Sequence, residues 1–171
     1  MMRQQQNACV VAQAKQMMDL SAKYNFEVNV VDKDGNVWVP AKKLHYKGNW
    51  ELVDCGDHAE LHESQWFKVF GETTLDKPAA EVYEDKYTGY FIVGRKDDES
   101  IVGDVKLELS PPDQANEYNF SELNPGEQVA FLLGECSSGH VKYSLTDDDT
   151  GILMKNGLLV YGVKFTPKKK T

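Results

Sequence analysis

The amino-acid sequence predicts a mainly β fold, an antiparallel β-sandwich or partly closed barrel preceded by one N-terminal α-helix. Roughly ten to twelve short runs of alternating apolar residues recur at intervals of about 8–12 residues, with turn-forming residues between them. No helical segments alternate with these runs, as the crossovers of a parallel sheet would require. The length of 171 residues suits one domain.

Residues 4–24 are predicted to form the helix. Apolar residues recur there close to the 3.6-residue period, the segment contains neither Pro nor Gly, and Asn25 suits its end. The apolar face is narrow and consists mainly of Ala, Val and Met. Two interpretations stay open: the helix packs on its own β domain, or it docks on a neighbouring subunit or partner. The candidate contact residues for docking are Val11, Ala14 and Met18.

The predicted β domain begins after this helix and opens with a hairpin. Residues 26–30 alternate between apolar and polar side chains, and Asp34-Gly35 is a strong signal for a turn into the apolar run 37–39. Asp32 and Asp34 have the spacing of a calcium loop, but the remaining ligand positions of such a loop are missing. The pair is therefore predicted to belong to the turn.

A second hairpin is predicted near the end of the chain. Asn156-Gly157 lies between the apolar runs 151–155 and 158–166, which indicates a type I′ turn with positive φ at both central residues. Pro167 is predicted to end the last strand. The chain then divides into an N-terminal helix (1–24) as a possible assembly arm, a single β domain (25–166), and a basic tail (167–171) that contains Lys168, Lys169 and Lys170.

The middle of the domain contains a long predicted strand and the longest predicted loop. Within residues 101–109, Val105, Leu107 and Leu109 face one way and Asp104, Lys106 and Glu108 the other, and Pro111-Pro112 ends the run. Residues 110–126 are polar and rich in turn formers, which favours a loop.

Charge is distributed unevenly along the chain and argues against nucleic-acid binding. The net charge is −8, yet residues 96–150 carry −10 and residues 151–171 carry +5. Only Arg3 and Arg95 supply the forked donors that read phosphates and guanine edges. An acidic, arginine-poor chain of this kind is a poor nucleic-acid binder.

Several function classes lack their sequence signatures. Neither glycine-rich phosphate-binding loop occurs, H-E-x-x-H is absent, and no apolar run approaches the roughly 18 residues of a membrane span. The apolar patch near the N-terminus is too short for a secretory signal, so synthesis in the cytoplasm without membrane association is expected. No catalytic residue and no cofactor is predicted.

The sequence contains one set of candidate metal ligands. Cys55 and His58 are three residues apart and Cys136 and His140 are four apart, so two turns could place two thiolates and two imidazoles around Zn²⁺. The preferred interpretation is simpler. Cys136 and His140 flank a hairpin turn, and His58 lies on a solvated acidic face, so no metal is expected.

These observations predict a non-enzymatic assembly or binding module. Basic termini around an acidic body suit a subunit of a homo-oligomer or a larger assembly, with a structural or accessory virion protein as one version. The alternative is an acidic inhibitor that blocks a basic or nucleic-acid-binding site on a host protein. A hydrolase or metal-dependent enzyme is the third reading. Trp38, Trp50 and Trp66 suit either a core or a binding surface.

Overall fold

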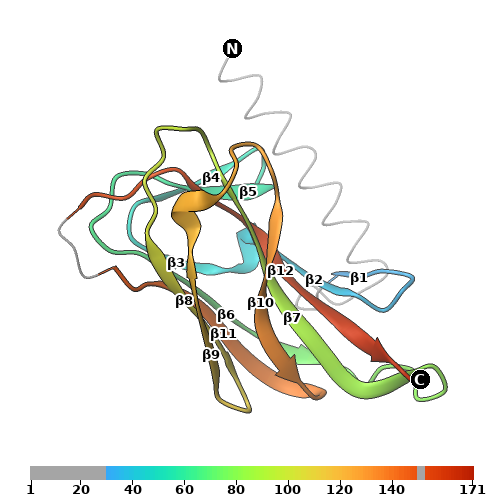
Figure 1. Ribbon diagram of the computed structural model, residues 1–171. Coiled ribbons are helices and arrows are strands. Elements are labelled where there is room, and N and C mark those ends of the chain that lie inside the picture. The colour runs from blue at the N-terminus through green and yellow to red at the C-terminus, as the bar shows by residue number, and fades with distance from the viewer. Residues whose placement is uncertain (1–29, 150–152) are drawn as a thin grey trace.

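Two antiparallel β-sheets packed face to face form the protein (Figure 1). The computed structural model describes residues 30–149 and 153–171. The seven-stranded sheet consists of β1 (Val30–Val31), β2 (Val37–Pro40), β4 (Trp50–Val53), β5 (His58–Leu61), β7 (Tyr83–Arg95), β10 (Val129–Cys136) and β12 (Leu158–Lys169). The five-stranded sheet consists of β3 (His45–Lys47), β6 (Lys68–Leu75), β8 (Asp104–Ser110), β9 (Gln114–Asn119) and β11 (Gly139–Asp147).

The order of strands joins distant parts of the chain. The five-stranded sheet has the order β3-β6-β11-β8-β9, and in the other sheet β12 pairs with β7 on one side and with β2 and β5 on the other. Two 3₁₀ turns, η1 (Ala41–Lys43) and η2 (Phe120–Glu122), connect strands. The predicted antiparallel β-sandwich is confirmed, whereas the helix predicted over 4–24 lies outside the described residues.

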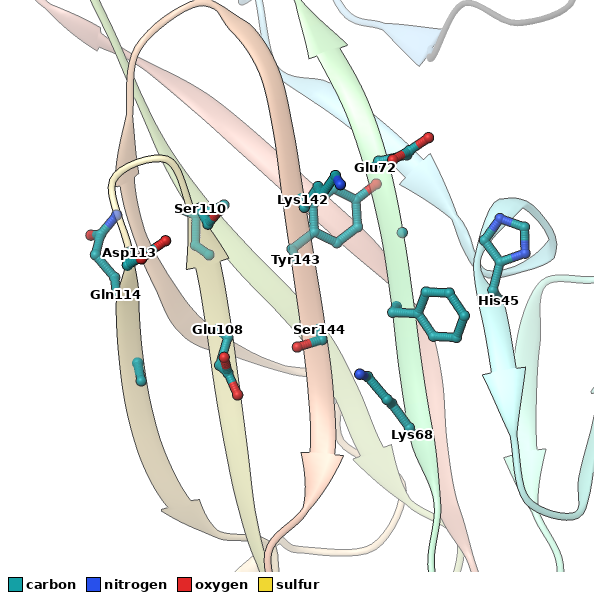
Figure 2. Close-up of a pocket in the computed structure, with 14 residues that line it drawn as sticks. His45, Lys68, Glu72, Glu108, Ser110, Asp113, Gln114, Lys142, Tyr143 and Ser144 are labelled. Carbon is teal, nitrogen blue, oxygen red and sulfur yellow. The ribbon is translucent and has the colours of Figure 1, made fainter.

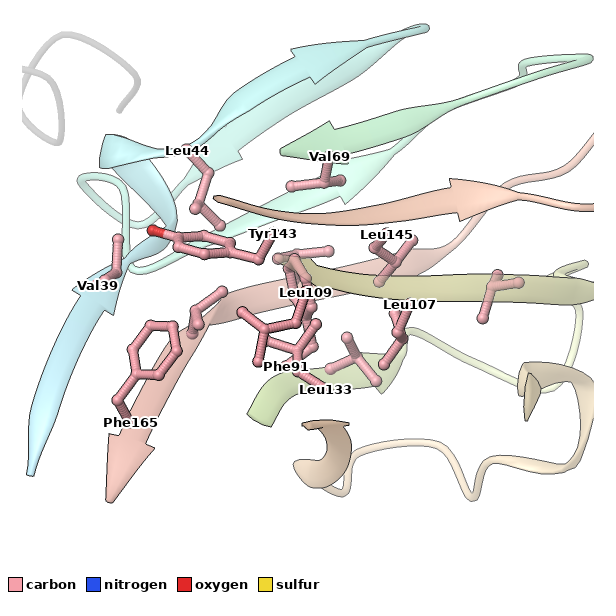
Figure 3. Packing of buried hydrophobic residues seen from close by; sticks show 14 of the residues in the cluster. Val39, Leu44, Val69, Phe91, Leu107, Leu109, Leu133, Tyr143, Leu145 and Phe165 are labelled. Atoms are coloured by element: carbon pink, nitrogen blue, oxygen red, sulfur yellow. The ribbon is translucent and has the colours of Figure 1, made fainter. Parts of the chain in front are cut away.

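The core lies between the inner faces of the two sheets. Strict alternation on β8 and β11 turns one set of side chains inward, where they meet side chains of β7 and β12 (Figure 3). Leu107, Leu145, Phe91 and Phe165 are fully buried. Because every second residue of these strands is buried, the residues between them must face outward, and this fixes the outer surface of each sheet.

The first predicted hairpin is confirmed. Val31 is opposite Val37, and Gly35 has a φ of +79° within the intervening turn. The Asp32 carboxylate accepts hydrogen bonds from the backbone N–H groups of Asp34 (2.9 Å) and Asn36 (3.0 Å). The carboxylate therefore stabilises the turn, as the sequence predicts.

The loop predicted over 110–126 is wrong, since β9 lies within it. On β9, the side chains that lean toward the other sheet are Gln114, Asn116 and Tyr118. They donate hydrogen bonds to the β10 carbonyls of Glu135 (2.7 Å), Leu133 (3.3 Å) and Leu132 (2.9 Å), respectively. A strand that faces carbonyl groups at the open edge of the sandwich needs donors rather than apolar side chains, so no apolar alternation marks it.

The end of the chain differs from the prediction in two places. Residues 153–155, which directly precede Asn156, form no strand, and Asn156 is absent from the positive-φ positions of the described chain, so no type I′ hairpin forms there. Pro167 does not end β12, which continues to Lys169 past an irregularity in register after Pro167. Proline is tolerated at such irregularities because no regular ladder hydrogen bond is required of it.

In the described ranges we find no helix with the length and apolarity to cross a membrane.

Candidate functional site

The outer face of the five-stranded sheet carries a groove whose lining is set by strand register. Cross-strand pairing places one outward residue of each strand directly opposite the next, giving a central row of His45, Phe70, Ser144, Glu108 and Ala115. Four interstrand spacings of about 4.8 Å make this row about 19 Å long. The groove has a volume of about 770 Å³.

Charged residues occupy the rows on either side. One flanking row consists of Lys47, Lys68, Thr146, Lys106 and Glu117, and the other contains Glu72, Lys142 and Ser110. Figure 2 shows Glu72 and Lys142 close together on adjacent strands, with Ser110 beyond them at the tip of β8. Both hydrogen-bond donors and acceptors therefore border the groove.

Phe70 supplies the one phenyl ring of the central row. The His45 ring stacks on it with centroids 5.3 Å apart and an interplanar angle of 27°. The Nζ atoms of Lys47 and Lys68 lie 5.9 Å and 5.5 Å from the centroid of the same ring. Two cations and an imidazole thus surround one half-buried aromatic ring at the β3 end.

The floor of the groove is closely packed. Tyr143 faces the core beneath it, and its hydroxyl shares a 2.7 Å hydrogen bond with Thr73. Burial raises the pKa of Tyr143 to about 12, so the side chain remains a neutral phenol. Gly71 is directly opposite Tyr143, and a Cβ atom at that position would lie 2.8 Å from the tyrosine ring. The absence of a side chain at Gly71 makes room for the ring.

At the end of the groove formed by β8 and β9, hydrogen bonds attach the five-stranded sheet to β10 of the other sheet. The Gln114 amide donates to the Pro112 carbonyl (3.0 Å) and the Glu135 carbonyl (2.7 Å), and it accepts from the Glu135 N–H (2.9 Å). All these contacts are to backbone groups, so the tip of the β8–β9 hairpin is fixed against β10. Figure 2 places Asp113 and Gln114 at this end, across the sheet from His45.

The four candidate zinc ligands are not brought together. His58 lies on β5 beside Asp57 (3.1 Å) and Tyr161, whereas His140 lies on β11 beside Glu72 (3.3 Å) and Thr74. Cys55 is engaged in a disulfide, and Cys136 is a buried free thiol whose pKa is raised to about 11 by desolvation. Within the described ranges, no three His, Cys, Asp or Glu side chains form a group that could hold a metal ion.

The other candidate residues have separate environments. Val11, Ala14 and Met18 lie outside the described residues. Lys168 lies 3.8 Å from Glu84 in a half-exposed ion pair, Lys169 ends β12, and the Lys170 N–H donates to the Val82 carbonyl. Of the tryptophans, Trp50 packs on Phe67 at the edge of the core, Trp38 lies half-buried on the outer face of the seven-stranded sheet, and Trp66 is 47% exposed. None of the three lines the groove.

Comparison with known proteins identifies a similar fold and no family. No protein-family model and no curated protein matches the chain. A β-(1,4)-mannanase with GH26 and CBM35 parts from Podospora anserina aligns with a TM-score of 0.52 at 14% identity, over 81% of this chain and 29% of that chain. This similarity shows a shared β-sandwich fold alone, and the chain spans less than a third of the mannanase.

Two further structures align at a lower score. A family 35 carbohydrate binding module from Clostridium thermocellum has a TM-score of 0.48 at 11% identity, over 76% of this chain and 96% of the module. The Cry4Aa toxin from Bacillus thuringiensis has a TM-score of 0.47 at 12% identity, over 79% of this chain and 24% of the toxin.

Proposed function

We propose that this protein is a non-enzymatic binding module whose groove holds a polysaccharide chain. The groove on the five-stranded sheet is the observation that supports the proposal. It is open, about 770 Å³ in volume, and lined by carboxylates, ammonium groups, hydroxyls and an amide around one aromatic ring. A polyhydroxylated chain presents both donors and acceptors along its length and apolar C–H faces that pack on an aromatic ring.

The arrangement of the carboxylates favours binding over hydrolysis. Glycoside hydrolysis needs two carboxyl groups about 5–10 Å apart on either side of the scissile bond. Glu72, Glu108 and Asp113 line the groove. The register separates Glu72 from Glu108 by two strands and two residues, which corresponds to about 12 Å between their Cα atoms and does not favour their acting as a hydrolytic pair.

Replacing Phe70 with alanine is expected to weaken polysaccharide binding at least tenfold, about 1.4 kcal/mol of binding free energy. The ring is half-buried in the central row, and its loss removes the apolar platform without changing the core. Affinity electrophoresis against a panel of soluble polysaccharides provides the measurement. The fold similarity to a mannanase makes β-1,4-linked mannan a sensible member of the panel.

Tyr90→Ala is the matched control, since Tyr90 is a half-buried aromatic residue on the outer face of the opposite sheet. It should leave polysaccharide binding within twofold of the parent. The proposal fails if the folded parent protein is retarded by no polysaccharide of the panel, or if both alanine variants lose binding equally.

A second candidate function is self-assembly, favoured by the outer face of the seven-stranded sheet. Register there aligns a largely apolar row of Val30, Trp38, Lys164, Tyr90 and Leu132. Val30 and Leu132 remain 38% and 41% exposed. Contiguous apolar surface of this kind is typical of interaction sites. We propose that residues 4–24 of one copy dock on this row of another copy.

Deleting residues 1–24 is expected to shift the protein toward monomer while the β domain stays folded. The deletion removes Val11, Ala14 and Met18, which would supply the apolar contact. Light scattering reports the mass and circular dichroism the fold. Deleting 168–171 should have a smaller, salt-sensitive effect because its contribution is electrostatic. A full-length protein that is monomeric at micromolar concentration contradicts self-assembly, and aggregation of the deletion variant indicates that the segment covers its own domain.

A further inference from the structure

The β3 end of the groove places two like charges directly opposite each other. Lys47 on β3 and Lys68 on β6 form a cross-strand pair, and like charges in that position destabilise a sheet. Their Nζ atoms converge on the same Phe70 ring. A ring quadrupole attracts each cation weakly, but it does not neutralise either of them.

Within the described chain, neither Lys47 nor Lys68 belongs to the small set of lysines that pair with a carboxylate. Among the described residues, carboxylate oxygens lie within 4.0 Å of Lys96, Lys106, Lys155 and Lys168. Lys47 and Lys68 have no such ion pair in the described part of the chain. What distinguishes these two lysines is their position, since they lie directly opposite each other with no carboxylate of the described residues between them in a protein whose net charge is −8.

Positive charge is concentrated at the β3 end of the groove. His45 and Lys47 of β3 lie directly opposite Phe70 and Lys68 of β6, so two ammonium groups and an imidazole lie together there. At the opposite end the acidic side chains Glu108, Asp113 and Glu117 outnumber the one described lysine of that end, Lys106. Figure 2 shows His45 and Lys68 on one side of the groove and Asp113 and Glu108 on the other. An anionic group is therefore favoured at the β3 end over the β9 end.

We infer that the groove takes an acidic polysaccharide, with a carboxylate or sulfate group of one sugar held between the ammonium groups of Lys47 and Lys68. This inference rests on the proposed polysaccharide binding and specifies its ligand class. A bound anion removes the cross-strand repulsion, so the energy of ligand binding includes relief of a conflict present in the free protein. The stacked His45 ring adds a hydrogen-bond donor at the same end.

Affinity for three polysaccharides tests the inference: polygalacturonate for carboxylate, chondroitin sulfate for sulfate, and neutral mannan. The full-length chain should bind one of the acidic polymers at least tenfold more tightly than mannan in dilute salt, and less so at high salt. Lys47→Gln and Lys68→Gln should each weaken acidic binding at least fivefold and leave mannan binding within twofold. Glutamine keeps most of the side-chain volume, and circular dichroism verifies the fold.

Lys106→Gln is the matched control, because Lys106 lies in the same row but has Glu108 as a partner at 3.9 Å. It should change acidic binding by less than twofold. Equal affinity for mannan and the acidic polymers, with Phe70→Ala abolishing both, overturns the acidic preference and leaves polysaccharide binding standing. Loss of acidic binding in Lys106→Gln as large as in the other two variants also overturns it, since binding would then follow overall charge.

Discussion

Replacing Lys155 with alanine is expected to lower the free energy of unfolding by about 3–5 kcal/mol. The Lys155 side chain is completely buried, its Nζ donates to the Gln65 carbonyl at 2.7 Å, and it lies 2.9 Å from Oδ2 of Asp147. The other carboxylate oxygen of Asp147 accepts from the Asp149 N–H at 3.0 Å. Removing the ammonium leaves a carboxylate buried without its counter-charge, and the cost of that isolated charge dominates the effect.

Chemical denaturation of three variants separates the contribution of charge from that of packing. Asp147→Asn should destabilise in the same direction as Lys155→Ala, whereas the double variant with Leu at 147 and Met at 155 should recover much of the loss, because an apolar pair needs no counter-charge. Lys96→Ala breaks an exposed ion pair with Glu60 and should leave the denaturation midpoint nearly unchanged. A Lys155→Ala variant as stable as the Lys96→Ala variant would show that the buried pair is not formed.

The position of this ion pair explains its importance for the fold. Asp147 is the last residue of β11, and Lys155 exchanges backbone hydrogen bonds with Ser64 at 3.0 Å and 2.8 Å. The pair thus ties the end of one strand in the five-stranded sheet to the segment that leads into β12 of the other sheet. Hydropathy gave no indication of it, since a lysine between Met154 and Asn156 looks like a residue on a solvated turn.

Local patterns predicted the strands whose two faces differ in polarity. Residues 101–109 were predicted as a strand, and β8 does bury Val105, Leu107 and Leu109. Such patterns fail where a strand faces backbone carbonyls rather than side chains, as β9 does, because donors then replace apolar residues on its inner face. The sequence of a polar strand at the edge of a sandwich therefore resembles that of a loop.

The groove could not be predicted because its lining depends on the order of strands. Phe70, Ser144 and Glu108 are neighbours through the β6-β11-β8 order, and no local signal in the sequence indicates that order. The four candidate zinc ligands lie apart for the converse reason. Cys55 and His58 are close in sequence, as are Cys136 and His140, but the topology does not bring the two pairs together. Proximity in sequence carries little information about long-range contacts in an antiparallel sandwich.

Gly157 does have the positive φ that the sequence predicts, but it does not belong to the predicted hairpin turn. The sequence predicted a type I′ hairpin, yet the residue bridges three other segments. Its N–H donates to the Leu61 carbonyl at 2.7 Å, its carbonyl accepts from the Lys96 N–H at 2.9 Å, and its Cα faces the buried side chain of Ser100. Its φ is +80°, so glycine is required there for conformation as well as for space.

Gly157→Ala is expected to destabilise the protein by about 3 kcal/mol or more. Positive φ for a non-glycine residue costs about 1–3 kcal/mol, and overpacking adds about 1–3 kcal/mol. A Cβ atom at 157 would collide with the side chain of Ser100 and approach its Cα atom to 3.1 Å, and backbone atoms cannot move away cheaply.

Gly126→Ala is the matched control, because its φ is +83° and no atom lies within 4 Å of the added carbon. That variant should lose only about 1 kcal/mol, the strain alone. Thermal and urea unfolding of the two variants measure the difference, and equal losses would show that Ser100 does not press against residue 157.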